Sequence, residues 1–266
     1  MSSYGWVLAL LLMSTSAFGE EPVLRLRAAG SLRAVMTEIS QAFTASGGPR
    51  VESTFGASGL LREGIEKGDP TDVFASADIR NAQLLADAGR AAPPIVFTRN
   101  QLCALLAPGI EAKADNLLER MLDPTVKLGT STPKADPSGD YAWQLFEKAE
   151  KLRPGAYAIL DKKALKLTGG ADSLQAPAGR SIYGMLIAEH KADVFLTYCT
   201  NAGAAAREVS GARVLTLPDA LAVGASYGLT VLNGAPPTAQ RFALYVLSVP
   251  GQTILARHGF TPVMLP

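Results

Sequence analysis

The chain has 266 residues, of which 48% are hydrophobic and 18% are charged, a balance typical of globular rather than disordered proteins. Lysine and arginine together number 25 against 24 aspartates and glutamates, so the formal net charge is +1. This near-neutral charge excludes the strongly basic surface with which proteins bind DNA, RNA or an anionic membrane. Any anion that binds this chain must therefore be held by local groups.

Residues 1–19 have the pattern of a cleaved export signal. An apolar block, Trp6 to Met13, is too short to span a bilayer, and small residues follow it. Ala17 and Gly19 place small side chains three residues and one residue before Glu20, where signal peptidase needs them. The first residues lack Lys and Arg, which leaves a buried N-terminal helix as the alternative. The sequence thus predicts an exported, periplasmic chain.

The first half of the exported chain alternates between strand and helix patterns. Strands are predicted at 23–30, 50–59 and 71–78, and helices at 31–48, 60–68 and 79–89. Asp78 is expected to cap the third helix, and Gly89 is expected to end it. This alternation indicates a mostly parallel sheet that is covered by helices.

The second half continues the alternation with more interruptions. Strands are predicted at 101–109, 193–202 and 227–235, a strand running into a long polar loop at 126–140, and helices at 116–124, 141–152, 179–192 and 238–260, the last as a helical pair. The pattern contains no internal repeat and no long linker. The fold class predicted from these elements is α/β.

Small and hydroxyl residues recur where predicted strands pass into helices. The four junctions are Gly30-Ser31, Gly56 to Gly59, Ser76 to Asp78, and Pro137 to Gly139. In open α/β sheets, ligands bind beyond the carboxyl ends of the strands, where helix N-termini present unpaired N–H groups. A serine in such a place is most often only a helix cap, so each junction alone is a weak signal. Their recurrence favours an anion site.

A catalytic interpretation has little support in the sequence. There is no GxSxG nucleophile motif and no phosphate-binding loop of the GxxxxGK[ST] type. A secreted serine hydrolase that used Ser58 or Ser138 would also need a histidine base. His190 follows a charged helix end and His258 lies in the last predicted helix, which suits surface positions better. We therefore expect a binding protein without catalytic residues.

The chain has two cysteines, Cys103 and Cys199. In an oxidising compartment an even number of cysteines favours a disulfide. Two buried free thiols in separate strands are the alternative. No cysteine or histidine cluster has the spacing of a zinc site.

Five segments together resemble one family. They are AAGSLRAVMTEI, FGASGLLREGIEKGDPTDVFASAD, PSGDYA, VFLTYCTNAG and GQTILARHGFTPV, and they are spread over the whole exported chain. The chain resembles the periplasmic molybdate-binding proteins of ABC import systems, which have the type II periplasmic-binding-protein fold. The resemblance implies two lobes, each a mostly parallel sheet flanked by helices, with the ligand in the cleft between them. The implied boundaries are 20–100 with 226–266 for the first lobe and 101–225 for the second.

The resemblance also implies a set of ligand-binding residues. Ser31 and Ser58 match the family's two hydroxyl donors from the first lobe. Ser138 and Arg180 match positions that supply backbone N–H groups from the second lobe, and Tyr198 matches a hydroxyl donor. Molybdate and tungstate are dianions without a proton, so a site made only of neutral donors suits both. The implied partner is an ABC permease in the inner membrane, and the receptor is expected to be a monomer without a cofactor.

Some residues depart from the family pattern. The family has a small or branched apolar residue where this chain has Arg180, whose guanidinium suits oxyanions well. The alternative is therefore a receptor for another anion, such as sulfate, another oxyanion or a small organic acid, that uses Arg180. Phosphate keeps a proton and favours a buried carboxylate acceptor, a role that Asp140 could fill. A bridge from Cys199 to Cys103 would stiffen the cleft wall near Tyr198.

Overall fold

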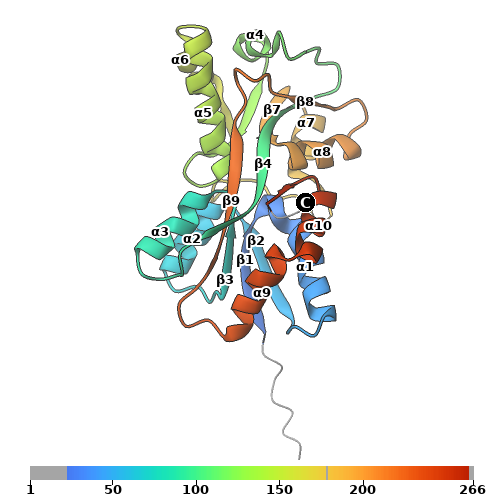
Figure 1. The fold of residues 1–266 in the computed structure, drawn as a ribbon. Helices are drawn as coiled ribbons and strands as arrows, with labels where there is room; N and C mark the ends of the chain where they lie inside the picture. The colour runs from blue at the N-terminus through green and yellow to red at the C-terminus, as the bar shows by residue number, and fades with distance from the viewer. Residues whose placement is uncertain (1–22, 178, 264–266) are drawn as a thin grey trace, which may run out of the picture.

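A computed structural model describes residues 23–177 and 179–263. The predicted signal segment, residues 1–19, lies outside the described residues. The described chain forms two lobes that are stacked end to end and joined by two long neighbouring strands (Figure 1). In this part of the chain no helix is both long enough and apolar enough to cross a membrane.

The lower lobe in Figure 1 is built mainly from the first third of the chain and the last helices. Its elements are β1 (Leu24–Ala29), the 3-10 turn η1 (Gly30–Leu32), α1 (Arg33–Ala45), β2 (Val51–Gly56), α2 (Ser58–Glu66), β3 (Val73–Ser76), α3 (Ile79–Asp87), α9 (Pro237–Leu247), α10 (Val249–Arg257) and β10 (Thr261–Pro262). Strand β1 pairs in parallel with both β2 and β3. The parallel sheet expected from the βα alternation is confirmed for these three strands.

Local sequence explains where these helices begin and end. Asp78 caps α3, and its carboxylate accepts a hydrogen bond from the Asn81 N–H at 2.8 Å. Gly89, just beyond this helix, has a φ of +67°, a conformation that glycine adopts without steric cost. Both predictions for the ends of this helix are confirmed.

The upper lobe holds most of the remaining elements. They are α4 (Leu117–Leu122), β5 (Leu128–Ser131), α5 (Pro137–Leu152), α6 (Ala156–Lys163), β6 (Leu165–Thr168), α7 (Ile182–Ala188), β7 (Val194–Tyr198), α8 (Cys199–Glu208) and β8 (Arg213–Thr216). Strand β5 pairs in parallel with β6 and β7. The expected strand at 193–202 is wrong in its second part, because the chain turns at Tyr198 and enters α8 directly.

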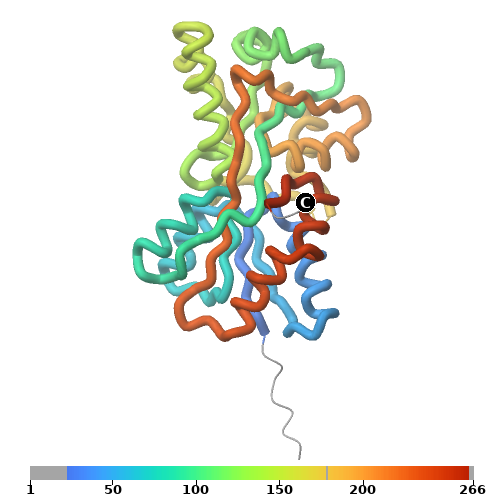
Figure 2. Tube along the Cα trace, in the orientation of Figure 1, coloured from blue at the N-terminus to red at the C-terminus, as the bar shows by residue number. Residues whose placement is uncertain are grey.

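Two long strands connect the lobes. Strand β4 (Ile95–Leu106) begins six residues before the strand predicted at 101–109, and β9 (Gly224–Val231) runs antiparallel beside its first half. The second half of β4 pairs with β7 and β8 instead. The sheet therefore runs in the order β2-β1-β3-β9-β4-β7-β5-β6. Figure 2 shows the chain passing between the lobes on these two strands.

Each lobe has its own hydrophobic core. The core of the lower lobe contains the apolar faces of β1, α1 and α9, whereas that of the upper lobe contains α5, β5 and parts of β4 and β7. Tyr198 from β7 packs with the lower core, and Tyr141 from α5 contacts both cores. The boundaries predicted at 100/101 and 225/226 fall inside β4 and β9, and they stay predictions.

Candidate functional site

Ser58 and Tyr198 come from different lobes and meet at one residue, Ala77. The Ala77 N–H donates a hydrogen bond to the Ser58 Oγ at 3.1 Å, and the Tyr198 hydroxyl donates to the Ala77 carbonyl at 3.3 Å. Ser58 is the first residue of α2, and Ala77 follows β3 directly. The N-terminus of α2 and the end of β3 thus lie at one place, where an α/β sheet is expected to bind its ligand.

Ser31 joins this group through a tyrosine that the sequence analysis missed. The Ser31 Oγ lies 3.0 Å from the hydroxyl of Tyr227 on β9. The ring of Tyr227 in turn lies 5.4 Å, centroid to centroid, from the ring of Tyr198. Ser31, Ser58 and Tyr198 therefore line one region at the boundary between the lobes.

The backbone N–H of Ser138 is hydrogen-bonded, whereas its hydroxyl has no partner among the described residues. Its N–H donates to the Asp136 carboxylate at 3.0 Å, because Asp136 caps α5 and Pro137 occupies the first helical position. Its side chain is buried, and its Oγ has no hydrogen-bond partner among the residues that the structure describes. The N–H predicted to bind an anion is therefore already occupied, and the free group is the hydroxyl.

Arg180 lies apart from the serine and tyrosine cluster. Its guanidinium is exposed and forms an ion pair with Glu208, with Nε 3.2 Å from the carboxylate oxygen. Its N–H donates to the Pro177 carbonyl at 3.1 Å. Glu208 also accepts two hydrogen bonds from the Ser181 N–H, which fixes the ion pair at the N-terminus of α7. Both groups of Arg180 that the sequence analysis considered are thus engaged elsewhere.

The two lobes touch beside Ser58. The Gly59 N–H donates to the Ala135 carbonyl at 2.9 Å, which ties the N-terminus of α2 to the loop before α5. A Cβ atom at Gly59 would lie 2.3 Å from the Lys134 carbonyl oxygen. Only glycine allows this approach, so backbone atoms of the two lobes are in direct contact at this point.

Carboxylates next to the cluster have raised pKa values. Burial raises the pKa of Asp136 to about 6. The negative charges of Asp140 and Asp78 also raise it, whereas hydrogen bonds from Ser138 and Ser131 lower it. Burial also raises the pKa of Asp140. The nearby tyrosine hydroxyls stay protonated, because burial raises the pKa of Tyr198 well above its usual value. The cluster is therefore lined by neutral donors, with Asp136 as a titrating neighbour.

A disulfide lies directly beside Tyr198. Cys103 on β4 is bonded to Cys199, the first residue of α8. The bridge joins one of the strands that connect the lobes to the residue after Tyr198. It therefore limits how far this tyrosine can move relative to β4.

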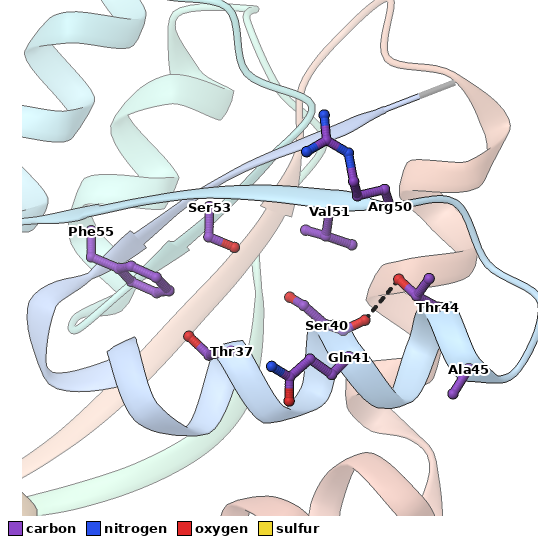
Figure 3. Close-up of a pocket in the computed structure, with 9 residues that line it drawn as sticks. All are labelled: Thr37, Ser40, Gln41, Thr44, Ala45, Arg50, Val51, Ser53 and Phe55. Atoms are coloured by element: carbon purple, nitrogen blue, oxygen red, sulfur yellow. Dashed lines mark hydrogen bonds between the residues drawn. The ribbon is translucent and has the colours of Figure 1, made fainter. Parts of the chain in front are cut away.

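A surface pocket in the lower lobe lies elsewhere. It is formed between α1 and β2, as Figure 3 shows, and its lining residues are Thr37, Ser40, Gln41, Thr44, Ala45, Arg50, Val51, Ser53 and Phe55. None of the predicted ligand-binding residues lines it. Over the described ranges, no group of three or more His, Cys, Asp or Glu side chains is placed to hold a metal ion.

Sequence reasoning missed Tyr227, Asn100 and Asp136. A visible signal existed for Asp136, since an Asp followed by Pro is a frequent helix start. No local signal existed for Tyr227 and Asn100, because each lies within a long strand and reaches the cluster only through pairing of β9 with β4. Their roles depend on contacts between residues far apart in the sequence.

The model of the family described as bacterial extracellular solute-binding protein matches residues 24–261. The chain belongs to this family. Its members are solute receptors for transport and not enzymes, so the expectation of a non-catalytic binding protein is confirmed. The hydrolase alternative is correspondingly excluded.

Two relatives cover almost the whole chain. An uncharacterized protein, PM1146, from Pasteurella multocida is 36% identical over 241 residues, which cover 90% of this chain and 98% of the relative. The molybdate-binding protein ModA from Escherichia coli is 27% identical over 255 residues, covering 92% of this chain and 91% of ModA.

Solved structures share the two-lobed fold. The periplasmic molybdate-binding protein from Azotobacter vinelandii aligns with a TM-score of 0.71 and 18% identity, covering 91% of this chain and 99% of that chain. The sulfate-binding protein SubI from Mycobacterium tuberculosis aligns with a TM-score of 0.73 and 18% identity, covering 91% and 87%. At these identities the structures establish the fold, and the predicted fold class is confirmed.

Proposed function

We propose that this solute-binding protein is a periplasmic receptor for molybdate, and also for tungstate, that delivers the anion to an ABC permease. The anion binds between the lobes, where hydroxyl groups of Ser31, Ser58 and Ser138 donate to its oxygens. The Tyr198 hydroxyl joins them when it releases the Ala77 carbonyl, to which it donates in this structure. Lobe closure around the anion is the state that the permease recognises. The receptor acts as a monomer and needs no cofactor.

The observation that carries the proposal is the hydrogen-bond state of two buried serines. Ser58 accepts a hydrogen bond from the Ala77 N–H, and its own hydrogen has no acceptor among the residues that the structure describes. Ser138 is buried with an Oγ that lacks a partner in the described chain. Buried polar groups are normally satisfied, so two hydroxyl hydrogens left at one lobe boundary favour a ligand that only accepts. A fully deprotonated oxyanion is such a ligand.

Neutral donors favour oxyanions that carry no proton, a class that includes molybdate. The exposed Arg180 guanidinium pairs with Glu208, so a receptor that used Arg180 for another anion would have to open this ion pair. Similarity to ModA over most of the chain supports molybdate at the level of a distant relative. Molybdate and tungstate have the same charge and nearly the same size, so one site suits both.

The experiment compares two serine substitutions that differ only in location. Ser138→Ala removes a buried hydroxyl without a partner in the described chain, and so does Ser40→Ala on α1, where Ser40 lines the surface pocket between α1 and β2. Each variant is expected to raise the free energy of unfolding by about 1 kcal/mol, because an unsatisfied buried group disappears. Only Ser138→Ala is expected to weaken molybdate binding, by about tenfold in calorimetry.

Two results would contradict the proposal. If molybdate bound to the wild-type protein no better than sulfate, phosphate and small organic acids, the assigned ligand would be wrong. If Ser138→Ala and Ser40→Ala bound molybdate as the wild type does, the serine cluster would not be the site.

A further inference from the structure

We propose that Tyr227 and Asn100 determine the anion selectivity of this receptor by fixing Ser31 as a hydrogen-bond donor toward the ligand. The inference rests on the proposed function, and it adds two residues that do not touch the anion. They are positioning residues, because they act on the ligand only through the hydroxyl of Ser31. The selected ligand class is tetrahedral oxyanions that carry no proton.

The first step is the orientation of the Asn100 amide. Its Oδ1 accepts a hydrogen bond from the Gln101 N–H at 2.9 Å, so the other end of the amide is the NH2 group. This Nδ2 donates to the Thr200 Oγ1 at 2.9 Å and to the Tyr227 hydroxyl at 3.5 Å. A backbone donor, which cannot reverse, therefore sets the direction of the network.

The second step passes this direction to Ser31. The Tyr227 hydroxyl has one hydrogen, and it already accepts from Asn100. Because this hydroxyl is buried, its hydrogen needs an acceptor, and among the described residues the Ser31 Oγ, 3.0 Å away, is the acceptor within reach. Tyr227 is fully buried and burial raises its pKa, so this hydrogen is not lost near neutral pH. Ser31 therefore accepts from Tyr227 and keeps its own hydrogen.

The third step concerns the ligand. Since Ser31 cannot give its hydrogen to Tyr227, the ligand oxygen that faces Ser31 is the acceptor available to it. An oxygen of molybdate or tungstate accepts well, because it is charged and carries no hydrogen. The protonated oxygen of hydrogen phosphate is a poorer acceptor and brings a donor of its own. The relay of Asn100, Tyr227 and Ser31 thus disfavours protonated anions.

The test reverses the relay with a substitution that hardly changes shape. In Asn100→Asp the new carboxylate accepts from Tyr227 more strongly than Ser31 does, so Ser31 must donate to Tyr227. Ser31 then presents only lone pairs to the ligand. At mildly alkaline pH molybdate and hydrogen phosphate are both dianions, so repulsion by the new carboxylate lowers both affinities alike. The ratio of the two affinities reports the relay alone.

The expected result is a fall of about tenfold or more in the ratio of molybdate to hydrogen phosphate affinity in Asn100→Asp. The control Thr200→Val removes the other acceptor of Asn100 and is expected to leave the ratio unchanged. Tyr227→Phe is expected to lower the ratio several-fold by itself, because Ser31 loses the donor that polarises it. In the double variant the ratio is expected to equal that of Tyr227→Phe, since the carboxylate no longer reaches Ser31.

The outcomes separate this inference from the proposed function. A wild-type protein that binds neither molybdate nor any other oxyanion overturns the proposed function and the inference with it. A wild-type protein that binds molybdate, together with an Asn100→Asp variant that loses both affinities by the same factor, overturns the inference alone. If Asn100→Asp does not fold, Tyr227→Phe provides the test. An unchanged ratio of molybdate to hydrogen phosphate affinity in Tyr227→Phe then overturns the inference alone. Asp136 is intact in every variant, so its carboxylate cannot cause differences between them.

Discussion

The candidate site depends on where individual hydroxyl hydrogens point. Ser58 accepts a hydrogen bond from the Ala77 N–H, and the Ser31 Oγ lies 3.0 Å from the Tyr227 hydroxyl, which in the proposed relay donates to it. A serine that is already an acceptor has its hydrogen available, so two neutral side chains act as directed donors. Such donors hold an oxyanion without a cation and leave selectivity to their direction.

Ser58→Ala tests the central donor. We expect molybdate binding to weaken by about 1.5–3 kcal/mol, the usual contribution of a hydrogen bond to a charged group. The free energy of unfolding is also expected to fall, because the buried Ala77 N–H loses its acceptor. Calorimetry and denaturant unfolding measure the two effects. Ser53→Ala, on β2 in the same lobe, is expected to change neither, and a Ser58→Ala variant with normal affinity would remove Ser58 from the site.

Asp136 predicts a pH dependence of binding. Its pKa in the folded protein is about 6, raised from 3.8, so its negative charge beside the cluster disappears as the pH falls through about 6. Anion affinity is therefore expected to rise as the pH falls from about 7.5 to about 5. In Asp136→Asn this dependence is expected to vanish, while the asparagine still caps α5. An equal dependence in both proteins, measured by titration at several pH values, would contradict the role of Asp136.

The raised pKa of Asp136 also predicts how stability depends on pH. A carboxylate whose pKa is lowered on folding stabilises the protein as the pH rises, and Asp136 is expected to do the opposite. Because the folded pKa of Asp136 lies above the unfolded one, its contribution to stability is present below about 3.8 and is lost as the pH rises through about 6. The difference in unfolding free energy between Asp136→Asn and the wild type is therefore expected to shift in favour of the variant as the pH rises from about 3.8 to about 6, and to stay constant above that range. A difference that does not vary with pH would contradict the burial of this carboxylate.

At the scale of elements, the contact between α2 and the loop before α5 controls closure. A methyl group at Gly59 meets the Lys134 carbonyl oxygen, so Gly59→Ala is expected to hold the lobes apart and to weaken anion binding by about 1–3 kcal/mol. The variant is not expected to unfold more easily, since alanine favours α2 more than glycine does by about 1 kcal/mol. Gly203→Ala on α8 is the control, because the nearest atom to its Cβ is 3.6 Å away. Equal affinities of the two variants would show that closure does not need this contact.

The helices and strands of the two halves of the chain could be predicted from the sequence to different extents. The strands and helices of the first half could be predicted because their alternation is regular and their caps are local. Four elements of the second lobe, α6, β6, α8 and β8, were missed; β6 and β8 have only four residues each, and α8 follows β7 without a turn signal. Periodicity over such short runs does not separate helix from strand.

For the site, the resemblance predicted three serines and one tyrosine that the structure places at or near the lobe boundary, but it did not predict the partners of two other groups. The Ser138 N–H is occupied by Asp136, and Arg180 is paired with Glu208. Neither contact can be predicted from spacing, because each depends on the direction of a side chain in the folded protein. The same holds for Tyr227, whose partner lies 196 residues away.

At the scale of the whole molecule, the disulfide connects β4, one of the two strands between the lobes, with the residue that follows Tyr198 of the candidate site. It closes a loop of 96 residues between Cys103 and Cys199. Replacing both cysteines by serine is expected to lower the free energy of unfolding by about 2–5 kcal/mol. Molybdate affinity is expected to fall as well, since Tyr198 precedes the bridge directly. Reduction of the wild-type protein provides the control, and an unchanged affinity in both cases would separate the bridge from the site.

The central claim is that neutral donors at the lobe boundary bind a fully deprotonated tetrahedral oxyanion. Titration calorimetry of the chain that begins at Glu20 tests it most directly, with molybdate, tungstate, sulfate and hydrogen phosphate as ligands in separate runs. We expect the chain to bind one molybdate, tungstate to displace it, and hydrogen phosphate to bind much more weakly. Absence of heat with molybdate and tungstate, or tighter binding of hydrogen phosphate than of molybdate, would contradict it.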